Sequence, residues 1–159
     1  MKKVVYTAIT GKYDELQEPH IKESDIDYVC FTNNSKIKSK VWEIRNFPEN
    51  LKHFDDNRKS KYLKILPHKI VSEYEASLWI DGNVKPKTRI SGIFNDAIEK
   101  SYISFFDHPN KRKSLLDEIN ACLALNKDRD EKILVQYNYY YHKFPELLEM
   151  DFMYPCCGL

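Results

Sequence analysis

Two oxygen-bearing side chains follow a short apolar run near the middle of the chain, and their types suit the binding of a cation. Asp81 and Asn83 stand on either side of Gly82, directly after the apolar run 78–80. An apolar run with turn residues on both sides is typical of a buried strand, and ligands of open α/β sheets bind outside the carboxyl ends of such strands. Carboxylate and amide oxygens are ligands of hard divalent cations. The pattern therefore suits a cation that holds a diphosphate.

A tight turn is the alternative interpretation of the same residues. Asp81 and Gly82 form a dipeptide that is also common in turns, and such a turn would join the strand to residues 84–86. From the spacing alone we favour the turn by about two to one. In either case Gly82 is expected to let the backbone turn sharply.

Length, charge and cysteine content predict one globular domain and argue against a nucleic-acid-binding or membrane-spanning protein. The 159 residues are enough for a single domain with a hydrophobic core. The formal net charge of +1 gives no case for a nucleic-acid partner, and no apolar run approaches the ~18 residues that span a bilayer. Residues 1–10 lack the long apolar core of a signal peptide and are expected to form a strand. The four cysteines have neither zinc spacing nor the density of a disulfide framework, so reduced thiols and a cytoplasmic location are expected.

Apolar periodicity predicts strands that alternate with helices. Strands are expected at residues 2–10, 25–32, 41–45, 78–80 and 101–107, and helices at residues 57–71, 90–100, 114–126 and 130–143. Pro67 is expected to kink or end the first of these helices. The order predicts an α/β fold in which helices cover a mostly parallel or mixed sheet.

Polar residues that a phosphate-bearing ligand could contact lie in the loop after the first strand and on the first helix. Residues 10–14 follow a buried strand, where an α/β protein often binds a nucleotide, although a plain turn is the simpler interpretation. The basic residues of the helix are Arg58, Lys59, Lys61 and Lys64. One or two of them would reach a pyrophosphate in the functional interpretation, and a solubilising helix face is an equally weighted alternative.

Two residues in the second half of the chain are candidates for a binding pocket. His108 follows a predicted strand and could serve as a ligand or an acid–base group, although a single histidine in a loop is usually neither. Gln136 and the tyrosines at residues 137–141 could face a sugar, because aromatic faces suit its C–H surfaces. Such tyrosines more often serve packing.

Several of these segments together resemble one known family of proteins. The segments are YTAITGKYD, DIDYVCFTNN, VWEIR, KSKYLKILPHK, YEASLWIDGNV, FDHPNKRKSLLDEINAC and FP. In their order and spacing they resemble the glycosyltransferase-like family that includes plant mucilage and pectin enzymes and a plant protein described as an alkaline ceramidase. Bacterial relatives in that family occur in surface-polysaccharide gene clusters. The resemblance covers roughly residues 4–145, and the layout is similar to glycogenin-type and lipopolysaccharide-type transferases of the GT-A fold.

The resemblance implies a metal-dependent glycosyltransferase with a GT-A-like, Rossmann-type mixed sheet flanked by helices. It implies that Asp81 and Asn83 stand where the carboxylates of an Asp-x-Asp motif stand and hold Mn²⁺ or Mg²⁺ against the diphosphate. The residues that it places near a nucleotide-sugar donor, such as a uridine-based one, are Thr7, Ala8, Thr10, Tyr13, Asp14, Arg58, Lys61, Lys64 and Asp81. His108 and Gln136 are implied only as pocket residues. The expected partners are the donor and a glycan acceptor of polysaccharide biosynthesis, with peripheral membrane association left open.

Two departures from the family pattern leave other functions open. The second position of the motif is an amide, Asn83, which binds a cation more weakly than a carboxylate does. Enzymes of this type usually continue with further strands after the position of Pro145, so we expect a single GT-A domain over residues 1–159 that is short at its C-terminus. One alternative is a non-catalytic module that binds a nucleotide sugar or glycan without turnover. Another is a lipid-amide hydrolase, against which the sequence shows no Ser-His-Asp arrangement, HExxH or GxSxG motif.

Overall fold

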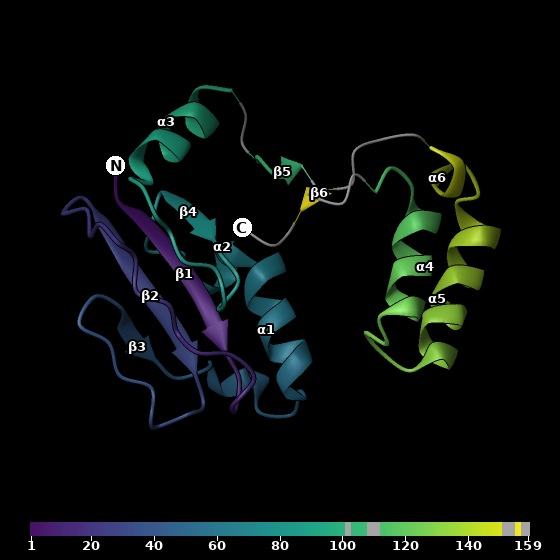
Figure 1. The fold of residues 1–159 in the computed structure, drawn as a ribbon, viewed down its shortest axis with the longest axis horizontal. Coiled ribbons are helices and arrows are strands. Elements are labelled where there is room, and N and C mark those ends of the chain that lie inside the picture. The colour runs from purple at the N-terminus through teal and green to yellow at the C-terminus, as the bar shows by residue number, and fades with distance from the viewer. Residues whose placement is uncertain (101–102, 108–111, 151–154, 157–159) are drawn as a thin grey trace. The chain divides into compact units, whose positions relative to one another are not determined.

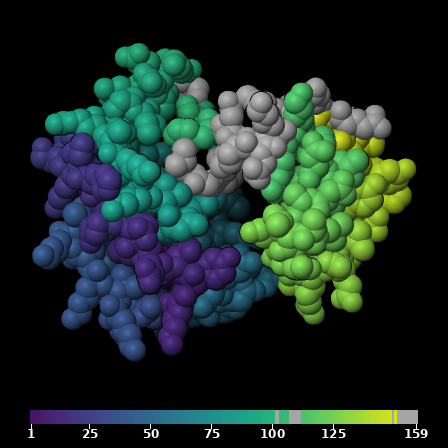
Figure 2. Space-filling view, in the orientation of Figure 1, coloured from purple at the N-terminus to yellow at the C-terminus, as the bar shows by residue number. Residues whose placement is uncertain are grey.

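The computed structural model describes residues 1–100, 103–107, 112–150 and 155–156, and these residues belong to two compact units. Of the described residues, those up to Ser104 belong to the first unit and those from Phe105 onward to the second. In the space-filling view, the purple N-terminal residues adjoin the teal residues that precede residue 100 on one continuous surface (Figure 2). The single-domain interpretation stays a prediction.

The first unit is built on a parallel sheet of four strands in the order β3-β2-β1-β4 (Figure 1). Its central strand is β1 (Lys3–Ile9), with β2 (Ile26–Thr32) on one side and β4 (Ala76–Trp79) on the other. The outer strand beside β2 is β3 (Glu43–Arg45). The predicted α/β class is therefore confirmed. Because the four strands are parallel, their carboxyl ends lie at one edge of the sheet.

Strand β1 is apolar along nearly its whole length because both of its faces are buried. Val5 and Ile9 belong to a core cluster that contains Phe94 of α3 (Ser91–Lys100). Alternate residues such as Tyr6 belong to a second cluster that contains Leu63 of α1 (Asp56–Ile65). The two helices thus supply apolar side chains to opposite faces of β1 (Figure 1).

The helix predicted over residues 57–71 is divided at Pro67. α1 ends at Ile65, and a short helix, α2 (Pro67–Ile70), begins at the proline. Leu66 between them has φ −122° and ψ 55°, outside helical geometry, because the proline ring disfavours a helical residue before it. A 3-10 turn, η1 (Glu49–Leu51), precedes α1 and contributes the buried Leu51.

The start of α3 is held by a carboxylate from a distant loop. Glu23 is buried, with 5% of its surface exposed. Its Oε2 accepts a hydrogen bond from the backbone N–H of Ile90 at 2.5 Å, and both of its oxygens accept from the N–H of Ser91 at 3.3 Å. These two N–H groups have no partner within the helix, so the carboxylate satisfies them.

The second unit contains a helical hairpin and a small pair of strands. α4 (Leu115–Ala124) is followed by α5 (Asp130–Lys143) and the short α6 (Glu146–Glu149) (Figure 1). A capping box between Ser114 and Asp117 starts α4. The strand predicted over residues 101–107 is confirmed only at β5 (Phe106–Asp107), which pairs antiparallel with β6 (Pro155–Cys156).

Candidate functional site

Asp81 lies at the carboxyl edge of the parallel sheet, where the sequence predicts it. The pairing of β4 with β1 continues one residue past Trp79, because the N–H of Ile80 donates to the carbonyl of Tyr6 at 3.1 Å. Asp81 follows immediately, with its side chain 38% exposed. Its Oδ1 accepts a hydrogen bond from Nζ of Lys64 at 3.1 Å and another from Nε1 of Trp79 at 2.7 Å. A carboxylate that remains partly accessible is thus held by two donors.

Residues 81–84 also form the tight turn that was the alternative interpretation. The N–H of Val84 donates to the carbonyl of Asp81 at 2.9 Å, and Asn83 is exposed in this turn. The turn is therefore confirmed, and the carboxylate stays at the sheet edge while the backbone makes it. Cation binding by Asp81 and Asn83 stays a prediction. Gly82 has no left-handed φ. It is required by space instead, because a Cβ there would lie 2.8 Å from Cγ1 of Ile9.

The loop after β1 brings a second carboxylate within electrostatic reach of Asp81. The N–H of Tyr13 donates to the carbonyl of Thr10 at 3.1 Å, and Gly11 has a left-handed φ of 56°. Burial, followed by the negative charge of Asp81, raises the pKa of the Asp14 carboxyl. A bound cation would lower the cost of keeping two carboxylates ionised near each other.

Amide side chains from the loop after β2 hold the loop after β1 in place. Oδ1 of Asn33 accepts from the N–H of Gly11 at 2.7 Å, and Nδ2 of Asn34 donates to the carbonyl of Gly11 at 2.7 Å. Asn33 also donates to Oδ1 of Asp56 at 3.1 Å, which links both loops to the first turn of α1. Sequence reasoning missed these residues as part of the site. Their position directly after a buried strand was the signal that could have found them.

The other predicted donor residues on β1 and its loop differ in exposure. The side chains of Thr7 and Ala8 are buried, with 1% and 7% exposed, and form part of the interior beneath the loop. Thr10 is half-buried, whereas Tyr13 is 83% exposed. The contact of these residues with a donor stays a prediction.

Of the basic residues predicted on α1, the structure brings Lys64 to Asp81. The guanidinium of Arg58 pairs with the carboxylate of Asp55, which is also the N-cap of the helix. Nζ of Lys59 lies 3.2 Å from Oδ1 of Asp56. The side chain of Lys61 is exposed. Arg58 therefore forms its ion pair within α1 and its N-cap, with a residue three positions earlier in the chain.

The pocket candidates of the second half of the chain are not placed beside Asp81. Gln136 is exposed on α5 in the second unit. His108 lies outside the described residues. Their roles stay predictions.

The family of the chain follows from a comparison with known domain families. The model of the family described as TOD1/MUCI70, glycosyltransferase-like domain, matches residues 1–144. The chain belongs to this family. The match extends into both compact units, and it confirms the resemblance to the mucilage- and pectin-type glycosyltransferase-like proteins. No curated protein and no solved structure matches the chain.

Membership of the TOD1/MUCI70 family supports a transferase that binds a sugar donor and an acceptor. Within the described parts of the chain, none of the helices has the length and apolar character to cross a membrane.

The carboxylates of this TOD1/MUCI70 domain suit a cation that shares its coordination with a ligand. Within the described ranges, no group of three or more His, Cys, Asp or Glu side chains could hold a metal by itself. Mg²⁺, however, is usually bound by one or two carboxylates together with water and substrate phosphates. Asp81 with Asp14 nearby, and the exposed amide of Asn83, fit that mode of binding.

A cavity of about 220 Å³ opens at the same edge of the sheet. It is lined by the ends of β2 and β3 and by two lysines: Thr32, Asn33, Asn46, Phe47, Pro48, Lys52 and Lys59. Asn33 connects it to the loop after β1 through the hydrogen bond with Gly11. The amides suit a polar group, and the two lysines are already paired with the carboxylates of Glu49 and Asp56.

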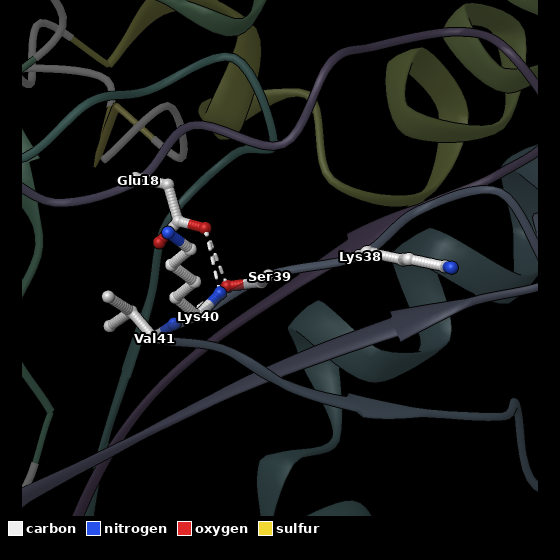
Figure 3. Close-up of a pocket in the computed structure, with 5 residues that line it drawn as sticks. All are labelled: Glu18, Lys38, Ser39, Lys40 and Val41. Atoms are coloured by element: carbon white, nitrogen blue, oxygen red, sulfur yellow. Dashed lines mark hydrogen bonds between the residues drawn. The ribbon is translucent and has the colours of Figure 1, made fainter.

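A second cavity, of about 550 Å³, lies where the segment before β3 meets Glu18 (Figure 3). It is lined by Glu18, Lys38, Ser39, Lys40 and Val41. Oε1 of Glu18 accepts from Oγ of Ser39 at 2.7 Å and from the N–H of Lys40 at 3.3 Å. These bonds bind the segment before β3 to the segment that follows Asp14, and none of the lining residues is one of the carboxylates of the sheet edge.

Proposed function

We propose that this chain is a metal-dependent glycosyltransferase that transfers a sugar from a nucleotide-sugar donor to a glycan or surface-polysaccharide acceptor. Membership of the glycosyltransferase-like family supports the class of reaction. The observation that carries the proposal is the convergence of Asp81, Lys64 and the Asp14 loop at the carboxyl edge of a parallel sheet. That edge is where ligands of such sheets bind.

Each of these residues has a role that follows from its charge. A divalent cation, Mn²⁺ or Mg²⁺, would act as a Lewis acid toward the departing nucleoside diphosphate. Asp81 would bind that cation, with Asp14 and the amide oxygen of Asn83 completing the protein ligands. Lys64 would contribute an ammonium that pairs with a diphosphate oxygen.

The cavity beyond Asn33 supplies room for part of the donor. Its volume of about 220 Å³ is smaller than that of a pocket for a whole drug-sized ligand. It therefore suits one group of the nucleotide rather than the complete donor. Two of its lining residues, Lys52 and Lys59, are paired with the carboxylates of Glu49 and Asp56, so a phosphate group would have to compete with these carboxylates.

The proposal is tested by a thermal-shift screen of nucleotide sugars with and without Mn²⁺. A donor present at 100 times its Kd stabilises the folded state by about 2.7 kcal/mol, which raises Tm by roughly 5–10 °C for a chain of this size. We expect one donor to do so only with metal, and Asp81→Asn to abolish the rise. Asp96→Asn, which alters an exposed carboxylate on α3, serves as the matched control.

The outcomes separate the proposal from its alternatives. A donor that stabilises equally without metal, or equally in Asp81→Asn, contradicts the cation site. Stabilisation by donor and metal without release of nucleoside diphosphate in the presence of glycan acceptors supports the non-catalytic binding module instead.

A further inference from the structure

Trp79 and Asp81 point to the same side of the chain at the end of β4. They are two residues apart, and alternate side chains of an extended segment share a face. The indole Nε1 of Trp79 donates to Oδ1 of Asp81 at 2.7 Å. Tryptophan has no acid–base chemistry, so this contact acts on the position of the carboxylate.

The indole ring is itself held from two other elements. The ring of Tyr6 on β1 packs edge-on against it with 5.2 Å between ring centroids. The hydroxyl of Tyr6 donates to the carbonyl of Leu63 on α1 at 3.2 Å. Tyr6 and Leu63 are 1% and 0% exposed, so this support lies inside the core. The position of the indole N–H is therefore determined by packed residues rather than by a mobile side chain.

The two donors to Oδ1 differ in what happens when a cation approaches. The ammonium of Lys64 carries a positive charge and repels a cation. The indole N–H is neutral, so its hydrogen bond is compatible with a cation on the other carboxylate oxygen. Among the described residues, no hydrogen bond is made to Oδ2 of Asp81, which leaves that oxygen available.

We propose that Trp79 is a positioning residue, whose N–H fixes Oδ1 of Asp81 so that Oδ2 is directed to a divalent cation. The inference rests on the proposed function, because it assigns a role within the same cation site. Partners that orient a metal ligand in this way typically change metal affinity 10–100-fold when they are removed.

The two tryptophans of the chain provide a direct spectroscopic test. Nε1 of Trp42 donates to the carbonyl of Gln17 at 3.0 Å, away from Asp81, so its indole signal is an internal reference. In a ¹⁵N-labelled full-length chain, Asp81→Asn is expected to move the indole N–H signal of Trp79 and to leave that of Trp42 in place. An unmoved Trp79 signal would show that the hydrogen bond is absent and would overturn the inference.

Titration with Mg²⁺ alone tests the role of the bond. Mg²⁺ is expected to move the Trp79 indole signal of the wild type and not that of Trp42. Trp79→Phe keeps an aromatic ring beside Tyr6 but removes the N–H donor together with part of the ring. We expect it to weaken Mg²⁺ binding about tenfold or more, followed through the backbone amide signals. Trp42→Phe is the matched control, because it also removes one indole hydrogen bond, and it should bind Mg²⁺ as the wild type does.

Different experimental results would contradict the proposed cation site and the positioning role of Trp79. If the wild type shows no response to Mg²⁺, the cation site of the proposed function is wrong and the positioning role falls with it. If the wild type responds and Trp79→Phe binds Mg²⁺ equally well, the cation site stands and the positioning role alone is wrong. A loss of Mg²⁺ binding in Trp42→Phe as large as in Trp79→Phe would assign the effect to general destabilisation and would also overturn the inference.

Discussion

The ammonium of Lys64 lies 3.1 Å from Oδ1 of Asp81, the carboxylate that we propose binds the divalent cation. The two side chains come from the last turn of α1 and from the turn after β4. The lysine is 23% exposed and the carboxylate 38%, so solvent screens the pair and its contribution to stability is small. If Asp81 binds a divalent cation as proposed, the ammonium of Lys64 would compete with that cation for the carboxylate.

Replacement of Lys64 by methionine should therefore separate metal binding from donor binding. We expect Lys64→Met to bind Mg²⁺ more tightly than the wild type, because a competing positive charge is removed. Loss of a hydrogen bond to a charged group costs about 1.5–3 kcal/mol, so binding of a nucleotide sugar should weaken about tenfold or more. Both affinities can be measured by calorimetry. Lys69→Met, which removes an exposed lysine of α2, is the control, and an unchanged Mg²⁺ affinity in Lys64→Met would refute the competition.

The substitution Gly82→Ala should destabilise the first unit and disturb the proposed cation site. Its Cβ would lie 2.8 Å from Cγ1 of Ile9, which is 1% exposed and cannot move freely. Overpacking of this kind costs about 1–3 kcal/mol, measurable by urea unfolding. Gly92→Ala on α3 is the matched control, because nothing lies within 4 Å of its added Cβ. That variant should keep its stability, because Gly92 is the second residue of α3 and the added methyl group meets no neighbour.

The buried carboxylate of Glu23 should be a main source of stability for α3. Glu23→Gln keeps the size of the side chain but replaces a charged acceptor of two N–H groups by a neutral one. Hydrogen bonds to charged groups contribute about 1.5–3 kcal/mol, and we expect a loss of that order in urea unfolding at pH 7. Glu99→Gln, at an exposed position of the same helix, should change stability little.

The contribution of Glu23 should also depend on pH. Burial by itself would raise the pKa of the Glu23 carboxyl, but hydrogen bonds from Ser91 and Ile90 and the charge of Arg89 together lower it. A carboxyl whose pKa is lower when folded stabilises the protein above its unfolded pKa, about 4.3, and loses that effect as pH falls through the folded pKa. The difference in unfolding free energy between wild type and Glu23→Gln should thus be constant near neutral pH and shrink below about pH 4. A difference that grows on acidification would contradict this assignment.

The cysteines of the two units should differ in reactivity. Cys30 is buried in β2, and burial raises the pKa of its thiol to about 12. Cys122 on α4 is partly exposed. Because the thiolate is the reactive form, iodoacetamide at pH 8 should modify Cys122 and spare Cys30 in the folded protein. Peptide mass spectrometry checks this, and equal labelling in urea confirms that both thiols are intact.

The elements of the fold were predicted well where the signal is local. The continuous apolar run of β1 and the break at Pro67 each depend on a few neighbouring residues, and both are confirmed. The residues 81–84 likewise contain both the turn and the carboxylate that their types suggested.

The contacts of the site depended on strand order, which local periodicity does not encode. Asn33 reaches Gly11 because β2 pairs with β1. Lys64 reaches Asp81 because α1 packs against β1, the strand that pairs with β4. The sequence predicts Trp79 only as part of an apolar strand, and the partner of its indole N–H, Asp81, is visible only in the structure. Arg58 pairs with Asp55, which lies about one helical turn earlier. This ion pair could have been predicted from the sequence, because side chains three residues apart are neighbours on a helix.

The place of β1 between β2 and β4 has a consequence for the synthesis of the chain. Residues 3–6 are paired on one side with residues 26–29 and on the other with residues 76–79. A nascent chain that ends before Ala76 leaves one edge of its most apolar strand uncovered, and uncovered strand edges promote association between chains. The seven residues of β1, five of them apolar, are therefore the segment that most needs protection while the ribosome is still making the rest of the chain.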